Sequence, residues 1–544
     1  MKRRHFILST AAGTLGMIPV IQSSCTGEKS KNMTGSDNGE SFIDDFSLNE
    51  LSIDQLQAKM KKDELTSQSI TRLYLNRIEQ LDKSGPGLNS VIEINPDAAT
   101  IAGEMDAERK AGKVRGPLHG IPILLKDNIG TADKMLTTAG SIALDWNKVK
   151  DDAFIVKKLR EAGAVILGKT NLSEWANYRS TRSSSGWSSR GGQTRNPYIT
   201  SRNPCGSSSG SGVAVAANLC SVAIGTETDG SIVCPSGING IVGIKPTMGL
   251  VSRSGIIPLA FSQDIAGPMT RTVTEAAIVL GVIAGLDPDD PVTKTGEGNI
   301  HTNYTQFLDK SGLKDKRIGI DPASLKIHEA VDNLMVQSLE LIKKQGAEIV
   351  EIDFLKKIQD LEPSESLVLS YEFKYALNKY LTATGGKMQS LKELMDFNRQ
   401  NEEKAMPFFK QELFESAEAK GDLYEQEYQD ALAKLLSSRD ILNDIFSKNR
   451  LDAICGPTNA PAWTTDPVNG DHYTWGFSTP AAISGFPAIT VPAGFVFELP
   501  IGLTFFSRPF TEPDLLAMAY SFEQVSVNRK SPKFLKDIIR YDHP

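Results

Sequence analysis

The sequence predicts an α/β fold: one large domain with a central mixed, mostly parallel β-sheet covered by helices on both faces. Short apolar runs bounded by glycine or polar residues are typical of buried strands, and they occur at residues 121–125, 164–167 and 222–224. Helical patterns, such as residues 152–162, separate these runs, and this alternation favours a parallel sheet. Strand-like runs return at residues 488–494 and 502–506, so we expect the sheet to span most of the chain.

The first residues predict an export signal. Lys2, Arg3 and Arg4 precede small and apolar residues that end near residue 21, a stretch too short to cross a bilayer. Residues 1–24 are therefore interpreted as a signal peptide, and the arginine pair resembles a twin-arginine signal. Cys25 follows two serines, as at a lipoprotein processing site. We expect an exported protein, either periplasmic or anchored to the membrane through a lipid on Cys25; the alternative is a plain signal peptide cleaved nearby.

A tether and one folded domain follow the signal. Residues 26–41 contain almost no large apolar side chain, and residues 25–45 are therefore predicted to be a flexible, solvated tether. The domain is expected at residues 46–541, and its first helices are expected to begin after the N-caps Ser52 and Thr66. Residues 287–449 are rich in Lys, Glu, Gln and Leu at helical spacing. Because strand-like runs resume after them, they are interpreted as a helix-rich insertion into one sheet.

Composition limits the partners and cofactors. The formal net charge of the 544 residues is −7, and no run of Lys and Arg is interleaved with aromatic residues, so nucleic-acid binding is not expected. A small-molecule or peptide substrate is expected instead, bound by a monomer or a homodimer. The five cysteines have neither metal-ligand spacing nor histidine partners, so we expect no metal and no organic cofactor.

Three segments carry candidate chemistry. Residues 205–212 are a Gly/Ser-rich run before an apolar helix, a place where backbone N–H groups can face a ligand. Ser231 follows an apolar strand end in a turn of small residues, as a nucleophile beside an oxyanion hole would. Lys126 ends the apolar run 121–125 and is either a sheet-edge charge or a buried functional amine. Taken singly, each segment has a structural alternative: a linker, a turn serine or a surface lysine.

Taken together, the three segments resemble the amidase signature family. The matching motifs are Gly120-Ile-Pro-x-x-x-Lys126-Asp127, Gly206-Ser207-Ser208, Gly225-Thr226, Gly230-Ser231-Ile232, Gly240, Gly243 to Thr247 and Pro487 to Gly494. The resemblance implies a single amidase-signature domain that hydrolyses carboxamides with water through an acyl-enzyme. By position it implies Ser231 as nucleophile, Ser207 as a proton relay after a cis peptide bond, and Lys126 as base. It also implies an oxyanion hole formed by the backbone N–H groups of Thr228, Asp229, Gly230 and Ser231.

This chemistry requires a neutral lysine. An amine accepts a proton only when it is uncharged, and burial disfavours the ammonium form, so the apolar residues before Lys126 are expected to lower its pKa. Ser207 would then connect Lys126 to Ser231. Cys205 and Cys234 flank the two serines, and a disulfide between them is conceivable but is not assigned.

Departures from the common family pattern indicate the substrate. Ser209 and Val233 replace a glycine and an arginine, while Glu227 and Asp229 change the turn before the nucleophile. This variant string resembles bacterial peptide amidases, which implies removal of C-terminal peptide carboxamides as ammonia. If the Asp229 carboxylate faces the pocket, it would disfavour a free C-terminal acid. The residues expected to bind substrate are Ser208, Asp229, Trp475 and Phe477, although the two aromatic residues have an alternative role as hydrophobic loop anchors.

Other functions fit the sequence less well. Residues 163–170 match a phosphate-loop pattern, but their centre is an apolar strand, which cannot cradle phosphate. No histidine lies in a recognisable Ser-His-Asp motif. Within the family, the amidase-type component of an amidotransferase that serves tRNA charging is disfavoured by the export signal and net charge, and a fatty-acid or aryl amide hydrolase is a further alternative. A lipoprotein that binds peptides without turnover is the alternative outside enzymes.

Overall fold

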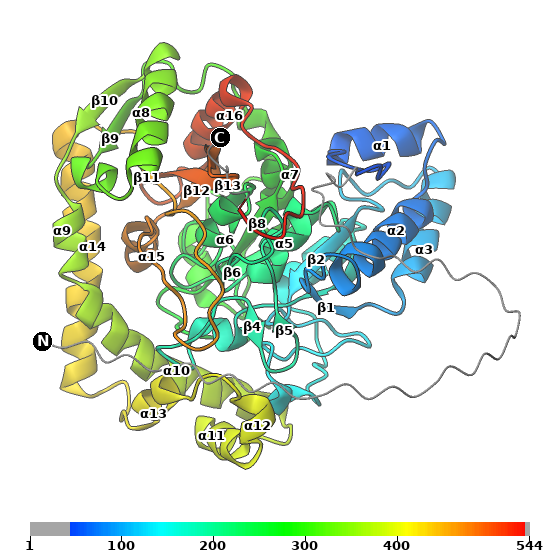
Figure 1. Ribbon diagram of the computed structural model, residues 1–544, viewed down its shortest axis with the longest axis horizontal. Coiled ribbons are helices and arrows are strands. Elements are labelled where there is room, and N and C mark those ends of the chain that lie inside the picture. The colour runs from blue at the N-terminus through cyan, green and yellow to red at the C-terminus, as the bar shows by residue number, and fades with distance from the viewer. Residues whose placement is uncertain (1–43, 539–544) are drawn as a thin grey trace, which may run out of the picture. The chain divides into compact units, whose positions relative to one another are not determined.

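The computed structural model describes residues 44–538, which lie in one compact unit (Figure 1). The predicted export signal, residues 1–24, lies outside the described residues, as does nearly all of the predicted tether, residues 25–45. Both therefore stay predictions. The folded part begins with a turn at residues 47–50 and continues into α1 (Ile53–Lys61).

One large sheet forms the centre of the molecule. Eleven strands follow the order β1-β3-β2-β6-β8-β7-β12-β13-β11-β9-β10. Their bounds are β1 (Val91–Ile94), β2 (Pro122–Lys126), β3 (Val165–Thr170), β6 (Val222–Glu227), β7 (Val242–Lys245), β8 (Ile265–Thr270), β9 (Arg317–Ile320), β10 (Glu348–Glu351), β11 (Ala453–Pro457), β12 (Ala488–Val496) and β13 (Leu499–Phe506). A separate hairpin joins β4 (Trp187–Ser188) to β5 (Gly192–Gln193).

The sheet is mixed. Strands β3, β2 and β6 pair in parallel on one side, and strands β11, β9 and β10 pair in parallel on the other. Antiparallel pairs through β8, β7, β12 and β13 join these two parallel groups, and β1 adds an antiparallel edge. The strand-like runs read from the sequence fall within β2, β3, β6, β12 and β13 or begin next to them, so the predicted α/β fold around a central mixed sheet is confirmed.

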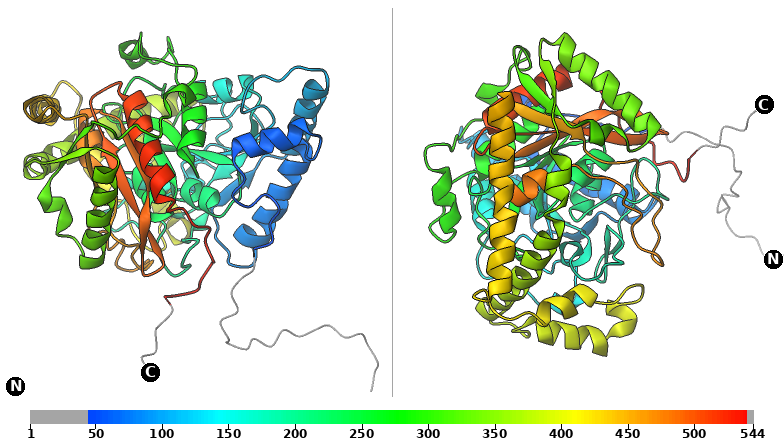
Figure 2. Two further views of the ribbon diagram at one scale, coloured as in Figure 1. Left: turned by 90° about the horizontal axis from the view of Figure 1, so that it is seen from above. Right: turned by 90° about the vertical axis from the view of Figure 1, so that its left-hand side faces the viewer.

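Helices cover the sheet in two layers (Figure 2). Helices α5 and α6 contact each other and the middle strands, whereas α4, α7, α16 and α8 form a separate row in which each helix contacts the next. The remaining bounds are α2 (Ser67–Arg77), α3 (Ala98–Lys110), α4 (Phe154–Glu161), α5 (Ser209–Ala216), α6 (Val233–Ile238), α7 (Val273–Ile283), α8 (Glu329–Lys344), α9 (Leu355–Gln359), α10 (Glu362–Thr384), α11 (Leu391–Gln400), α12 (Glu402–Ala405), α13 (Glu412–Glu418), α14 (Gln426–Asn449), α15 (Thr479–Ser484) and α16 (Glu512–Ser526).

Local sequence signals set several element ends. The Ser52 hydroxyl accepts a hydrogen bond from the Gln55 N–H and the Thr66 hydroxyl accepts one from the Ser69 N–H, so both predicted N-caps are confirmed. Each is a capping box, which satisfies backbone N–H groups that have no partner inside the helix.

The helix-rich segment, residues 287–449, also contributes to the sheet. It contains helices α8 to α14, but its strands β9 and β10 extend the sheet beyond β11. Its two longest helices, α10 and α14, pack against each other over a second apolar core that includes Val368, Leu435 and Phe446. Further along α10, Phe373 stacks on Phe414 in a third core. Because α10 also borders the turn after β6, the segment reaches the candidate active site.

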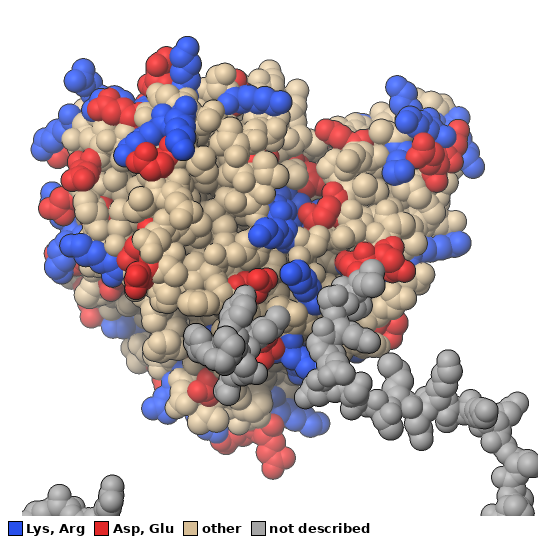
Figure 3. All heavy atoms as spheres, turned by 45° about the horizontal axis from the view of Figure 1, so that its top comes forward, with Lys and Arg blue, Asp and Glu red and all other residues tan. Residues whose placement is uncertain are grey.

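The surface carries charges of both signs. On the face drawn in Figure 3, Lys and Arg side chains alternate with Asp and Glu and form no continuous basic area. Within residues 44–538, none of the helices combines the length and the apolar character that crossing a bilayer requires.

Candidate active site

Lys126 is the last residue of β2 and is fully buried. Its Nζ donates hydrogen bonds to the Ser207 Oγ at 2.7 Å, to the Thr226 Oγ1 at 2.9 Å and to the Thr226 carbonyl oxygen at 3.1 Å. Burial lowers the pKa of the amine from 10.5 to about 7, against the smaller opposing effects of Asp264 and Glu227. The predicted buried amine is therefore present, and near neutral pH a large fraction of it is uncharged.

Ser207 lies between that amine and the turn after β6. The Gly206–Ser207 peptide bond is cis, as the resemblance implied, and Ser207 is fully buried. The preceding glycine is required by space, because a Cβ on Gly206 would come within 2.1 Å of the Ser173 Oγ. Helix α5 begins two residues later and fixes the segment against the sheet, since every one of its residues is buried.

Ser231 stands in the turn between β6 and α6. Its side chain is 7% exposed and borders a cavity, and it makes no hydrogen bond to another residue within 44–538. The predicted contact between the two serine hydroxyls is thus not formed in this structure. The segments are nevertheless held together, because the Ser208 N–H donates to the Ser231 carbonyl oxygen at 3.2 Å.

The turn leaves backbone donors free for a ligand. In the described part of the chain, the N–H groups of Asp229, Gly230 and Ser231 meet no acceptor. The Glu227 carboxylate holds the far side of the turn, where it accepts from the N–H groups of Ile232 at 2.7 Å and Val233 at 3.0 Å. Free N–H groups next to a serine at a helix start are the arrangement that stabilises a developing oxyanion.

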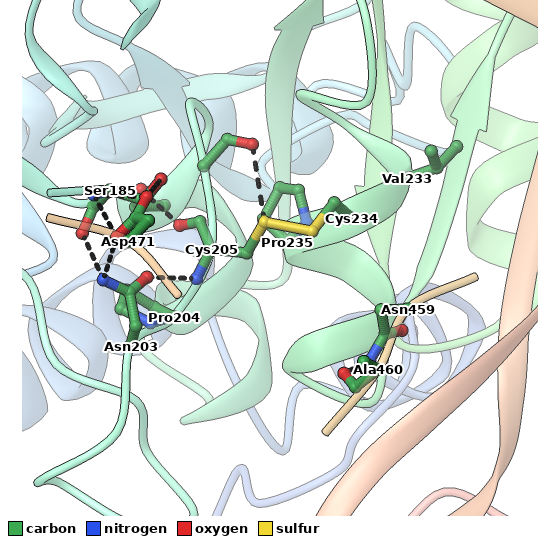
Figure 4. Close-up of a disulfide and its surroundings, with 12 residues drawn as sticks. Ser185, Asn203, Pro204, Cys205, Val233, Cys234, Pro235, Asn459, Ala460 and Asp471 are labelled. Atoms are coloured by element: carbon green, nitrogen blue, oxygen red, sulfur yellow. Dashed lines mark hydrogen bonds between the residues drawn. A yellow bond between two sulfur atoms is a disulfide. The ribbon is translucent and has the colours of Figure 1, made fainter. Parts of the chain in front are cut away.

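A disulfide fastens the two serine segments to each other. Cys205 and Cys234 are bonded, which settles the pairing that the sequence left open (Figure 4). Cys205 lies two residues before Ser207, and Cys234 lies three residues after Ser231. Of the other cysteines within residues 44–538, Cys220 and Cys455 are free and buried.

Thr226 and Thr228, which the motifs had indicated, are supported by polar residues from outside those motifs. Thr226 receives hydrogen bonds from Lys126 and, at 3.0 Å, from the Asn128 side chain. Thr228 donates its hydroxyl to Asp264 at 2.6 Å, and its carbonyl oxygen accepts from the Gln263 side chain at 3.4 Å. Thr226 was visible only as part of the Gly225-Thr226 motif, while Gln263 and Asp264 have no distinguishing sequence signal.

The cavity beside Ser231, here called the serine cavity, has a volume of about 480 Å³. Three carboxylates border it, from Asp229, Glu362 and Asp471, and no Lys, Arg or His of the described residues does so. Its aromatic wall consists of Trp463, Tyr473 and Trp475. Asp471 is satisfied by four donors, from Ser185 Oγ and N–H, Asn203 and Trp463.

Asp229 is the carboxylate nearest in sequence to the nucleophile. Its Oδ2 accepts from the Thr479 hydroxyl at 2.7 Å, whereas its buried Oδ1 has no partner among the described residues. Burial raises the pKa of this carboxyl, with hydrogen bonds from Ser478 and Thr479 acting in the opposite direction. Asp229, which borders the serine cavity, therefore has a carboxylate oxygen that can still accept a hydrogen bond.

Two of the predicted substrate-binding residues lie elsewhere. Ser208 is fully buried, and its hydroxyl donates to the Thr226 carbonyl oxygen and accepts from the Thr226 N–H, so it fixes the end of β6 instead of facing the cavity. Phe477 is 1% exposed and packs against Phe354 and Phe506 in the second core. Asp229 and Trp475 do border the cavity. Residues 165–170 of the phosphate-loop pattern form β3, as expected.

Comparisons with known proteins agree with this geometry. The sequence pattern that defines the amidase family matches residues 69–516. A probable amidase of Arabidopsis thaliana is 41% identical over 501 residues, which cover 90% of this chain and 93% of the relative. A component of the glutamyl-tRNA(Gln) amidotransferase of Thermoanaerobacter pseudethanolicus is 33% identical over 504 residues, covering 89% and 98% of the two chains. The crystal structure of the peptide amidase of Stenotrophomonas maltophilia superposes with a TM-score of 0.86 and 47% identity, covering 90% and 99%.

The match extends over most of the chain in each comparison, and the fold agrees with that of the solved peptide amidase. The protein is a hydrolase that acts on the carbon–nitrogen bond of amides. It belongs to the amidase family.

Proposed function

We propose that this amidase removes the C-terminal carboxamide of peptides, with Ser231 as nucleophile, Ser207 as proton relay and Lys126 as base. The observation that carries the proposal is the 2.7 Å hydrogen bond between the Lys126 Nζ and the Ser207 Oγ in a fully buried position. A desolvated amine with a pKa of about 7 takes up a proton where an ordinary lysine would already hold one.

The reaction proceeds in two halves. The Ser231 oxygen attacks the amide carbon while its proton passes to Ser207, and the Ser207 proton passes to Lys126; the carbonyl oxygen becomes an oxyanion at the N–H groups of the turn. The C–N bond then breaks, and the relay returns a proton to the leaving nitrogen, so ammonia departs and an acyl-ester remains on Ser231. Water, deprotonated along the same relay, attacks the ester and releases the acid and the free serine.

The contact from Ser207 to Ser231 forms when substrate binds. Catalytic hydrogen bonds are often long or absent in a free enzyme and tighten in the complex, so the unpartnered Ser231 hydroxyl fits this scheme. The main chains of the two segments are already linked, because the Ser208 N–H donates to the Ser231 carbonyl oxygen.

The charge of the serine cavity supports a peptide amide as substrate. Its polar wall carries carboxylates, with Asp229 next but one to the nucleophile. A product with a new carboxylate is repelled there, whereas a neutral carboxamide is not. The 47% identity to a peptide amidase points to the same substrate class. Free glutamine, which carries its own α-carboxylate, is disfavoured by this wall.

Ammonia release across a set of amides tests the proposal. The wild-type enzyme is expected to release ammonia from N-acetylated dipeptide amides faster than from free glutamine, asparagine, aryl amides or fatty amides. Ser231→Ala is expected to abolish release while still binding the peptide amide by calorimetry. The exposed Ser366 of α10 provides the matched control, and Ser366→Ala is expected to retain full activity. Turnover by Ser231→Ala at the wild-type rate contradicts the proposed nucleophile.

The role of Asp229 has its own test. Asp229→Asn keeps the shape and removes the negative charge, so the free peptide acid is expected to inhibit the variant more strongly than the wild type. Glu297→Gln, an exposed carboxylate that does not border the serine cavity, is the control. Unchanged inhibition by the acid in Asp229→Asn rules out a charge-based rejection of product.

The proposal includes export. The sequence of residues 1–24 supports it, and so does the disulfide, since such bonds persist in oxidising compartments and are rare in reducing ones. Fractionation of cells that express the full chain is expected to recover activity in the periplasm or on membranes. Cys25→Ser distinguishes a lipid-anchored protein from a periplasmic one. The substitution is expected to release the anchored protein from membranes and to leave the location of a periplasmic protein unchanged.

A further inference from the structure

A second cavity lies next to the catalytic residues and has no role in the scheme above. It has a volume of about 630 Å³ and is here called the apolar cavity. Its apolar walls include the loop of residues 256–261 and one side of α10, with Ile257, Leu259, Phe373 and Ala376 among them. Charged side chains border it as well, from Arg253, Asp264, Asp289, Asp290 and Lys379. Two aromatic side chains at its rim are exposed, Phe261 by 36% and Tyr375 by 49%, and their rings meet edge to face at 6.1 Å.

The floor of the apolar cavity belongs to the catalytic centre. Thr226, which accepts two hydrogen bonds from Lys126, borders it, as does Thr228 at the start of the oxyanion turn. Asn128 also borders it, and the buried Asn128 Oδ1 has no partner among residues 44–538. A group bound in this cavity therefore contacts residues that hold the catalytic amine of Lys126.

The two cavities flank the same turn. Residues 226 and 228 border the apolar cavity, whereas Asp229, Gly230 and Ser231 border the serine cavity. Ala176 borders both. It lies in a turn in which Trp175, Ala176 and Asn177 all have positive φ angles, of 54°, 55° and 72°, a conformation that is costly for residues other than glycine. Ala176, the residue that borders both cavities, has only a methyl group as its side chain.

We propose that the apolar cavity receives the side chain of the residue that bears the carboxamide, while the rest of the peptide lies in the serine cavity, so that peptide amides with a large apolar last residue are preferred. This inference rests on the proposed function. The substrate carbonyl group would lie at the free N–H groups of the turn between β6 and α6. The side chain and the rest of the peptide would lie on opposite sides of Ala176.

The leaving group does not account for this space. Ammonia is no larger than water and does not need a cavity of about 630 Å³, so this space is available to the acyl part of the substrate. The peptide backbone carries polar N–H and C=O groups that suit the polar wall of the serine cavity, whereas an aromatic or aliphatic side chain gains from apolar walls. Ala176, which borders both cavities, presents only a methyl group to the substrate.

Filling the apolar cavity tests the assignment. N-acetylphenylalanine amide and N-acetylglycine amide differ only in the side chain that this cavity would hold. In the wild type, kcat/KM for the phenylalanine amide is expected to exceed that for the glycine amide by about 10- to 100-fold, the discrimination that burial of one large apolar side chain supplies. Ala376→Phe, which projects a ring into the cavity from α10, is expected to collapse that ratio towards one.

A matched control and a second variant guard against a folding defect. Ser366→Phe adds the same ring to an exposed position of α10 that borders neither cavity, and it is expected to keep the wild-type ratio. Ala383→Trp narrows the cavity at its exposed rim, where a large side chain disturbs no packed core, and it is expected to reduce the ratio as well. Equal loss of both substrates in Ala376→Phe and in Ala383→Trp overturns the assignment.

Binding without turnover separates this inference from the proposed function. With Ser231→Ala, calorimetry is expected to give tighter binding of the phenylalanine amide than of the glycine amide, and Ala376→Phe in that background is expected to remove the difference. If the enzyme turns over peptide amides but neither variant changes the binding or rate ratio, only the inference about the cavity fails. If no peptide amide is turned over, and N-acetylphenylalanine amide still binds the apolar cavity, the proposed function fails instead.

Discussion

Lys126 differs from an ordinary surface lysine because it is fully buried and its hydrogen-bond partners are uncharged. Its three hydrogen-bond acceptors are two hydroxyls and a carbonyl oxygen, and no carboxylate forms an ion pair with it within the described residues. Burial is the main cause of its lowered pKa, and Asp264 and Glu227 offset it only in part. The amine therefore serves as a base at neutral pH, a function that an exposed lysine cannot perform.

The pH dependence of the reaction follows from this lowered pKa. The neutral amine is the active form, so kcat/KM for a neutral peptide amide is expected to rise with pH through about 7 and to level off above it. The measurement is kcat/KM from pH 5 to 9 at constant ionic strength. Lys126→Met is expected to lose activity at every pH, because no base replaces the amine.

A second buried lysine gives the control for that prediction. Lys169 is also fully buried and its pKa is lowered by burial to about 8, but its Nζ donates to the Ile129 carbonyl oxygen and the Thr137 hydroxyl. Lys169→Met is expected to lower stability and to leave the midpoint of the kcat/KM profile near 7. The assignment of Lys126 as the base is contradicted if Lys169→Met shifts the midpoint of the kcat/KM profile while active variants of Lys126 leave it in place.

The turn between β6 and α6 is held in shape by side chains from distant elements. The Gln263 amide connects the Thr228 carbonyl oxygen to the Glu365 carboxyl of α10, at 3.4 and 2.8 Å. In a trans peptide the C=O of one residue and the N–H of the next point in opposite directions. A donor on the Thr228 carbonyl oxygen therefore orients the Asp229 N–H towards the expected oxyanion position.

Replacing Gln263 tests this positioning. Gln263→Leu removes the donor and keeps the size, so kcat is expected to fall by about 10- to 100-fold with little change in KM, because the oxyanion develops only in the transition state. Steady-state kinetics on a peptide amide measure both constants. Gln389→Leu, in the exposed segment after α10, is the matched control and is expected to behave as the wild type. A rise in KM with unchanged kcat would place Gln263 in substrate binding instead.

Helix α10 also makes stability depend on pH through Glu365. Burial and the neighbouring Asp229 raise the pKa of Glu365 from 4.5 to about 8, so the folded state holds this proton more tightly than the unfolded chain does. Its contribution is fully present below about 4.5 and is lost as pH rises through about 8. In urea unfolding from pH 4 to 9, Glu365→Gln is expected to show a smaller loss of unfolding free energy with rising pH than the wild type. An identical pH dependence in the two proteins contradicts the raised pKa.

Sequence patterns predicted elements better than they predicted side-chain directions. Periodicity and end signals located the buried strands and the N-caps Ser52 and Thr66, since both depend on near neighbours in the chain. Trp475 and Phe477 lie two residues apart in a segment without regular structure, where no periodicity determines which side chain faces inward. Only the folded contacts place Trp475 at the cavity and Phe477 in the core. Gln263 and Glu365 are far apart in sequence, so no local pattern connects them.

At the scale of the whole molecule, the catalytic residues come from separate chain segments that the folded sheet and the turns beside it bring together. Parallel pairing of β2 with β6 places the end of Lys126's strand beside Thr226. The family motifs predicted which residues meet, but not the support from the helix-rich segment or the second cavity. That support and that cavity both depend on where α10 lies. Apolar residues at helical spacing predict a helix, but they do not predict the surface against which the helix packs.

The disulfide fixes the two serine segments within that arrangement, and its removal is expected to affect stability and activity together. Cys205 and Cys234 are 29 residues apart. Closing a loop of that length lowers the conformational entropy of the unfolded chain and so raises its free energy by about 3–4 kcal/mol. The double variant Cys205→Ser and Cys234→Ser is expected to lose about that much unfolding free energy in urea, with a lower kcat because the two serines are less firmly held. Dithiothreitol is expected to destabilise the wild type and to leave the double variant unchanged, since Cys220 and Cys455 are free. Equal urea midpoints for the wild type with and without dithiothreitol, in samples whose thiol content confirms reduction, show that the bond does not stabilise the fold.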